Sequence, residues 1–237
     1  MNSGKGSALI LGFCICAGLV VLCLSLGSAL IRFKNMERFV SVKGLSEREV
    51  SANIVVWPLS FASADNDLGA LYAAMEENAK KIVAFFQEAG FSESEITVGA
   101  PVVTDRFARR YESQPHGGFR YTAHQTVTVY TGRVDAVRAL KSRLGELGKK
   151  GIALGGEGIQ SAEFLFTKLN ELKPAMVEET TRNARAVAEK FAADSKSRLG
   201  KIKRASQGQF SIEDRDSNTP HIKKVRVVST VEYYLSD

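Results

Sequence analysis

The stretch Ala108–Tyr130 holds the side chains best suited to chemistry: His116 and His124, three arginines and three tyrosines. A histidine near such groups could serve as a general base. The order ARRYESQPHGG, however, has the proline, glycines and charged residues that are typical of a loop. From Phe119, polar and apolar residues then alternate, which predicts a half-exposed strand. We interpret the stretch as a polar loop that enters a strand, without catalytic residues.

The enzymatic alternative would use this same stretch. A pocket joining Arg109, Tyr111, His116 and His124 would favour a hydrolase-like enzyme. The chain lacks the Gly-x-Ser-x-Gly turn that presents a nucleophilic serine in many hydrolases. Paired glutamates occur at 76–77 and 178–179, but adjacent residues of a helix point in different directions. We therefore predict no catalytic residue.

Metal-ligating side chains are too scattered to predict a metal site. A zinc site needs three or four converging ligands, usually with a close pair among them. The histidines, His116, His124 and His221, form no such pair, and the three cysteines lie at positions 14, 16 and 23. From Leu24 to Asp237 the chain therefore offers no disulfide, thiolate nucleophile or cysteine ligand.

Two loops match ligand-binding motifs only in part. The segment Asp214–Asn218 (DRDSN) opens like a calcium-binding loop, but Thr219 stands at the glycine position and Val225 at the bidentate glutamate position. The segment Gly151–Gly158 (GIALGGEG) is not followed by Lys-Ser/Thr and leads into a strand, unlike a phosphate-binding loop. We interpret them as a solvated hairpin turn and a flexible connector. No metal-binding or cofactor-binding residue is predicted.

The charge balance argues against a nucleic-acid partner. The chain carries 32 basic and 26 acidic side chains, a net charge of +6, and these are interspersed rather than gathered in a basic stripe. A mild positive excess is compatible with anionic lipid headgroups. Hydrophobic residues make up 44% of the chain, which is typical of a folded protein.

The segment Ala8–Ile31 contains no charged residue. As a helix it would be about 36 Å long at about 1.5 Å per residue, enough to cross a hydrocarbon core of about 30 Å. We therefore expect a short tail over residues 1–7, a membrane anchor over 8–31 and a linker over 32–36, leading to a domain over 37–237. Gly27–Ala29 would allow cleavage as a signal peptide, but the long apolar run favours a permanent anchor that contacts the bilayer.

Charges beside the anchor leave its orientation open. Arg32, Lys34 and Arg38 follow it, whereas Lys5 precedes it. The positive-inside tendency would then place the following domain in the cytoplasm, although long domains are translocated despite such charges. The alternative to an envelope protein is therefore a signalling adaptor on the cytoplasmic face of the membrane.

Residues 37–237 predict an α+β domain with the element order ββαββαβαββ and a mainly antiparallel or mixed sheet. The expected strands are residues 37–44 and 50–62, joined by a polar connection at 45–49, then 96–107, about eleven residues from Phe119, 159–168, 201–212 and 221–235. The expected helices run from residues 65–67 to Gly90, over 134–147, and from 169 or 170 to 199. Pro58 and Pro101 predict irregularities in their strands, since proline cannot donate a ladder hydrogen bond.

The last helix is rich in small residues. Ala184, Ala188 and Ala192 share one side and would let the helix lie close to a sheet. The predicted inner stripe consists of Met176, Thr180, Ala184, Val187, Ala188, Phe191 and Ser195.

Four segments in this order resemble the SIMPL domain family of bacterial envelope proteins: FFQEAGFSESEITVGAPVV, GGFRYTAHQTVTVYT, GIQSAEFLFTKL and the alanine-rich helix that ends in SRLGKI. The resemblance covers roughly residues 37–235. It implies an extracytoplasmic location, ring-like homo-oligomers and an association with stress protection, and it supplies no catalytic residue.

These observations predict a non-enzymatic, membrane-anchored protein of the bacterial inner membrane whose domain lies in the periplasm. We expect it to act by self-assembly or by binding a protein partner. Exposed strand edges, or the face that carries Trp57 and Phe61, are the expected contact surfaces between copies.

Overall fold

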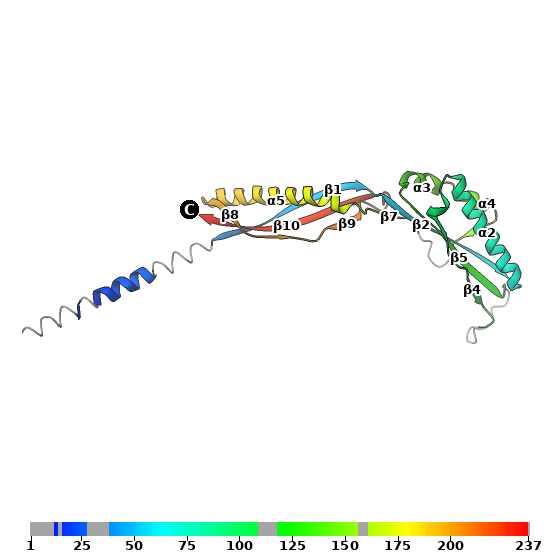
Figure 1. The fold of residues 1–237 in the computed structure, drawn as a ribbon, viewed down its shortest axis with the longest axis horizontal. Helices are drawn as coiled ribbons and strands as arrows, with labels where there is room; N and C mark the ends of the chain where they lie inside the picture. Colours follow the sequence, from blue (N-terminus) through cyan, green and yellow to red (C-terminus); the bar gives the residue numbers. More distant parts are fainter. Residues whose placement is uncertain (1–11, 14–15, 28–37, 109–117, 156–160, 237) are drawn as a thin grey trace, which may run out of the picture. The chain divides into compact units, whose positions relative to one another are not determined.

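The computed structural model describes residues 12–13, 16–27, 38–108, 118–155 and 161–236. The described residues divide into two compact units, taken separately below (Figure 1). The first unit draws on Met1–Glu47, Lys173–Ser211 and Arg226–Asp237, and the second on Arg48–Leu172 and Ile212–Val225. Antiparallel strands with packed helices confirm the predicted α+β class.

The second unit is built around a long antiparallel pair, β2 (Ile54–Asp65) and β5 (Tyr121–Thr131). Its sheet has the order β3-β5-β2-β6, with β4 also paired to β5 and β7 to β2. The short outer strands are β3 (Ile96–Val98), β4 (Val102–Asp105), β6 (Ala153–Leu154) and β7 (Glu163–Leu165). Helix α2 (Leu68–Glu88) lies along this sheet (Figure 1). Near it lie η1 (Glu93–Glu95), α3 (Val134–Lys141) and α4 (Gly145–Lys149).

Large apolar side chains fill the space between this sheet and its helices. Trp57 and Phe61 are buried there, and the Trp57 ring meets Phe86 edge to face with 5.6 Å between ring centroids. The predicted contact between copies through Trp57 and Phe61 is therefore wrong, because α2 already covers that face. Pro58 lies where the outer pairing of β2 is interrupted, between the residues bound to β7 and those bound to β6.

The ends of α2 follow the local sequence signals. The Asp67 side chain accepts a hydrogen bond from the Ala70 amide at 2.7 Å, which caps the N-terminus. At the other end Gly90 adopts a positive φ of 84° and its amide binds the Gln87 carbonyl at 2.8 Å. The next amide, that of Phe91, binds the Phe86 carbonyl at 3.1 Å, which completes a Schellman motif.

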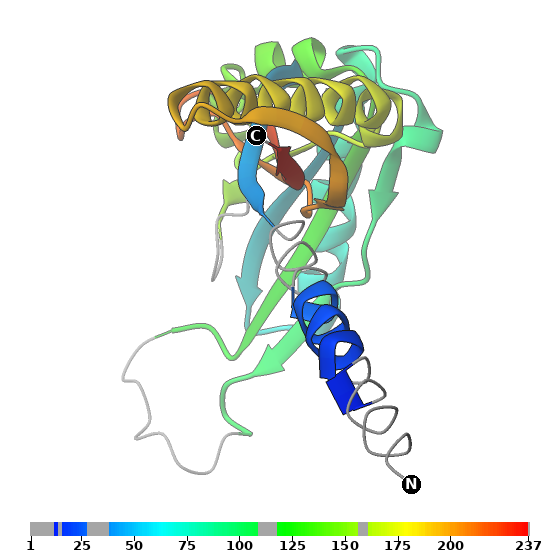
Figure 2. The same ribbon diagram turned by 90° about the vertical axis from the view of Figure 1, so that its left-hand side faces the viewer.

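The first unit packs one helix on a sheet of order β1-β10-β8, to which β9 is added along β10. Its strands are β1 (Phe39–Ser51), β8 (Arg198–Gln207), β9 (Ser211–Asp214) and β10 (Ile222–Ser236). Helix α5 (Leu169–Asp194) lies along one face of this sheet (Figures 1 and 2). Its buried residues are Met176, Thr180, Ala184, Ala188 and Ala192, as the alanine pattern predicts.

Helix α5 approaches the backbone of β1 at Gly44. A Cβ atom on Gly44 would lie 1.8 Å from the Thr180 carbonyl oxygen and 2.8 Å from the Ala184 nitrogen. Hydrogen bonds then hold α5 in register on β10 and β1. The Thr180 and Ser229 hydroxyls are 2.8 Å apart, and Ser46 donates to Glu179 at 2.9 Å.

Several predicted boundaries are wrong. Residues 45–49 belong to β1, because the polar Ser46 faces α5 and is satisfied there by Glu179. The strand expected at 96–107 is divided into β3 and β4, and the helix expected at 134–147 into α3 and α4. Val187 and Phe191 are 38 and 57% exposed, so they flank the inner stripe of α5 rather than join it.

The predicted anchor is described only in part. Residues 12–13 and 16–27 are helical, whereas the rest of 8–31 lies outside the described residues. No helix within the described part of the chain is both long and apolar enough to cross a membrane.

We expect Gly44→Ala to destabilise the protein by about 3 kcal/mol, because the added methyl group overlaps the backbone of α5 and forces the helix away. Chemical denaturation followed by circular dichroism would measure this loss. Gly148→Ala is the matched control, because a Cβ on Gly148 meets nothing within 4 Å. Equal stability of the two variants would contradict the close approach.

Candidate functional site

Of the four side chains named for the enzymatic alternative, the structure describes His124. His124 is exposed on β5 and pairs with Ala62 and Val102, whereas Tyr121 lies on the opposite face of that strand. Arg109, Tyr111 and His116 lie outside the described residues. The enzymatic alternative therefore stays a prediction.

Arg120 fixes the point at which the chain returns to β5. Its Nη2 donates to Asp105 Oδ2 at 2.9 Å, its guanidinium lies 4.8 Å from the Tyr121 ring centroid, and its amide binds Asn66 at 3.0 Å. The hydrogen bond from Arg120 holds the pKa of Asp105 below its usual value. Both side chains therefore stay charged and are held in place by these contacts, which suits a structural role.

His221 lies just before β10, away from any second histidine of the described chain that could share a metal. Its carbonyl accepts the Ala52 amide at 2.8 Å, and its ring packs edge to face on Phe164. Burial lowers its pKa, and the charge of Arg138 adds to that effect. Within the described residues, no three His, Cys, Asp or Glu side chains gather as metal ligands would.

In each pair of adjacent glutamates, the two side chains bind different partners. Glu76 binds Lys80 at 2.6 Å, and Glu77 binds Lys81 at 2.7 Å. On α5, Glu178 binds Arg182 while Glu179 accepts from Ser46. Neither pair forms a carboxylate dyad.

The two partial motifs have different outcomes. The Asp214–Asn218 segment begins at the end of β9 and forms a turn, as predicted: the Asp216 carboxylate accepts the amides of Asn218 and Thr219 at 2.9 and 2.8 Å. In Gly151–Gly158, residues 153–154 form β6 against β2, so that part is not a flexible connector. Residues 156–158 lie outside the described residues.

The sheet of the first unit has one face that points away from α5, which we call the uncovered face. It carries Phe39, Leu45 and Tyr234, which are 45, 41 and 40% exposed. Lys203 Nζ lies 3.8 Å from the Phe39 ring centroid and 5.8 Å from that of Tyr234. Phe39 and Tyr234 thus both lie near Lys203, and Leu45 adds apolar surface farther along β1. Helix α5 lies on the opposite face of this sheet (Figure 2). Exposed aromatic and apolar side chains on one face of a sheet are typical of an interaction site.

Strand β8 forms one edge of the same sheet and exposes nearly all of its residues. Its register against β10 shifts twice, beside Tyr233. It also carries Lys201, Lys203 and Arg204. Basic side chains and bulges disfavour the addition of another strand to an edge, so the uncovered face is the stronger candidate for contact.

A family model described as SIMPL, a protein of unknown function (DUF541), matches residues 40–233. The chain belongs to the SIMPL family. The match spans both units of this SIMPL chain and confirms the resemblance noted from the four sequence segments. No curated protein matches the chain.

In this SIMPL chain we expect Thr219→Val to raise the pKa of Asp216 from about 2 toward its ordinary value of 3.8. The Thr219 hydroxyl is the largest cause of the lowered pKa, ahead of Arg215. Because the folded pKa is depressed, the turn contributes stability above the unfolded pKa, and this contribution is lost as the pH falls through about 2.

Titration of the Asp216 carboxyl carbon by NMR would measure the change. Ser217→Ala alters the same turn without removing a donor to Asp216 that the structure shows, and it should leave the pKa unchanged. An unchanged pKa in Thr219→Val would contradict the assigned hydrogen bond.

Proposed function

We propose that this SIMPL chain is a single-pass protein of the bacterial inner membrane that acts by self-assembly in the periplasm, without bond-making chemistry. The observation that carries the proposal is the uncovered face, with Phe39, Leu45 and Tyr234 exposed on a sheet that α5 covers only on the other side. The uncharged segment at 8–31 and the envelope location that the family resemblance implies support the anchor and the compartment.

The chemistry of the uncovered face suits contact between identical copies. Along β1 this face carries the apolar Phe39 and Leu45 beside the charged Lys43 and Glu47, and Glu47 forms an ion pair of 3.5 Å with Arg226 on the same face. In a two-fold contact Glu47 of one copy can lie opposite Arg226 of the other, and the reverse, so that opposite charges pair while apolar surface is buried. Val187 and Phe191, exposed on α5, offer a second apolar strip for a larger assembly.

We expect Leu45→Glu to weaken assembly at least tenfold, because the variant places a carboxylate in a contact that would otherwise bury apolar surface. Light scattering of the full chain in lipid nanodiscs or detergent, over a range of concentrations, would report the mass. Leu68→Glu is the matched control: Leu68 is a similarly exposed leucine, at 43%, on α2 of the second unit.

Two results would contradict assembly through this face. One is a wild-type chain that stays monomeric at every concentration. The other is an oligomer whose mass Leu45→Glu leaves unchanged or Leu68→Glu reduces equally. A monomer that captures a different protein would instead support partner binding.

We expect an alkaline phosphatase fused after Asp237 to be active in cells, because that enzyme requires the periplasm. The charges at Arg32, Lys34 and Arg38 would instead favour a cytoplasmic Asp237. In that case the phosphatase would be inactive, and green fluorescent protein fused at the same place would fluoresce. That second pattern would replace the envelope location with a cytoplasmic one.

A further inference from the structure

Gln125 is a polar side chain in an apolar layer of the second unit. It lies on β5 between Ala123 and Val127, both fully buried, and pairs across the sheet with the buried Phe61. Only 8% of Gln125 is exposed. A buried amide at such a position normally satisfies both its donor and its acceptor.

A bulge between the neighbouring strands β3 and β4 provides an acceptor for the NH2 group of this amide. Val98 pairs with Val127 and Val102 with His124, so the three residues 99–101 face only two residues of β5. The Gly99 carbonyl accepts Gln125 Nε2 at 2.8 Å. Turning the amide over would set Oε1 against that carbonyl, acceptor against acceptor, so the orientation of the amide is determined by chemistry.

Among the described residues, no group donates to Gln125 Oε1. The hydrogen bond from Nε2 to the Gly99 carbonyl gives the nitrogen a structural role, because it holds the bulge in place. It gives no such role to the oxygen. An unsatisfied buried acceptor is disfavoured, and one that borders a cavity marks a place for a donor from outside the chain.

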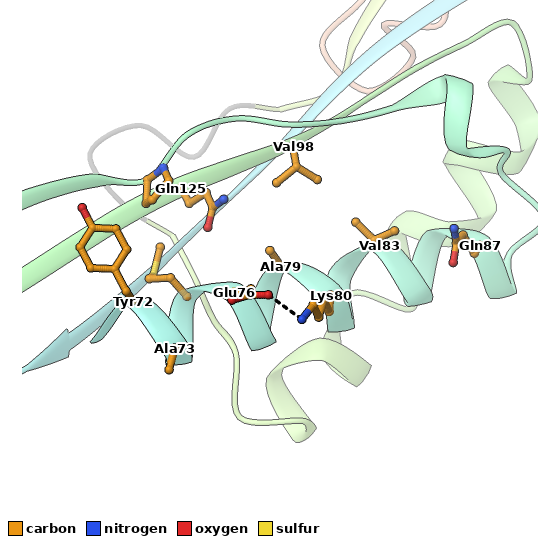
Figure 3. A pocket seen from close by; sticks show the side chains of 11 residues that line it. Tyr72, Ala73, Glu76, Ala79, Lys80, Val83, Gln87, Val98 and Gln125 are labelled. Carbon is orange, nitrogen blue, oxygen red and sulfur yellow. Dashed lines mark hydrogen bonds and ion pairs between the residues drawn. The ribbon is translucent and has the colours of Figure 1, made fainter. Parts of the chain in front are cut away.

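The Gln125 side chain lines a groove of about 790 Å³ between α2 and the bulged edge. Figure 3 shows Gln125 reaching from the sheet toward the helix, with Tyr72, Ala79 and Val83 on the helix side and Val98 on the sheet side. Met75 and Pro101 complete an apolar lining. Cavities of this size suit a small organic molecule, whereas a single water molecule needs only about 30 Å³.

The charges at the rim cancel one another. Glu76 and Lys80 bind each other at 2.6 Å, as the dashed line in Figure 3 marks. Both belong to the exposed face of α2, and each neutralises the other. The groove therefore offers apolar surface, the buried Gln125 acceptor and the polar ends of Tyr72 and Gln87, without a net charge to attract an ion.

We propose that this groove binds a small neutral molecule with an apolar body and one O–H or N–H group, which donates to Gln125 Oε1. The alkylphenols represent this class. The site is confined to the second unit and does not depend on the proposed assembly of the first.

The test compares 4-butylphenol with 4-butylanisole, which keeps the apolar body but lacks the donor. The full chain, labelled with 13C in its methionine methyl groups, is held in lipid nanodiscs and titrated with each probe. Met75 lines the groove and reports binding, while Met176, buried in the first unit, is an internal control for non-specific effects. We expect a saturable shift of Met75 alone, and about tenfold tighter binding of the phenol than of the ether.

Two variants separate the parts of the site. Gln125→Met keeps the length of the side chain and removes the acceptor, so phenol and ether should bind equally. Val98→Trp changes a residue that is 46% exposed at the groove and should block both probes without disturbing the core. Equal binding of the two probes to the wild-type chain, no shift of Met75, equal shifts of Met75 and Met176, or full binding to Val98→Trp would each overturn the proposal.

Discussion

Helix α5 touches the backbone of β1 at Gly44, and the architecture of the first unit follows from this contact. Side chains as small as Ala184 and Ala188 allow the approach, so the layer between helix and sheet is thin. A thin layer buries little apolar surface, and hydrogen bonds such as the one between Thr180 and Ser229 must keep the helix in register. One helix also covers only one face, which leaves the opposite face of the sheet as the surface available for contact.

In the second unit, large side chains fill the layer between the helix and the sheet. Trp57, Phe86 and Phe91 interlock edge to face beneath α2, and the apolar layer is correspondingly thick. Toward the β3–β4 edge this filling stops, because the helix presents Ala79 and the edge is bulged. The groove and Gln125 lie at this edge, where large side chains no longer fill the space between α2 and the sheet.

Elements whose signals are local could be predicted from the sequence. The Asp67 cap, the Gly90 stop and the alternation along β5 each depend on a few neighbouring residues, and the structure confirms them. Ser46 was misread as part of a loop because its partner, Glu179, is 133 residues away in the chain. The prediction places Phe191 in the inner stripe of α5, although it is exposed, because helical spacing gives the direction of a buried stripe but not its width. Gln125 left a trace in the sequence, a lone amide on an apolar face, but its unmet oxygen depends on a bulge in another strand.

The bulge at residues 99–101 also decides which way the following side chains point. With three residues there, Val103 turns toward the helix layer and Asp105 stands across from Tyr121, within reach of Arg120. If all three residues were instead paired one to one with β5, the alternation would invert along all of β4, sending Val103 to solvent and Asp105 to the other side of the sheet. The bulge therefore absorbs one extra residue: a chain shorter by one residue at this point could pair with β5 as a regular ladder and keep Asp105 opposite Tyr121, whereas loss of the bulge at the present length would be felt at the Asp105–Arg120 pair, several residues downstream.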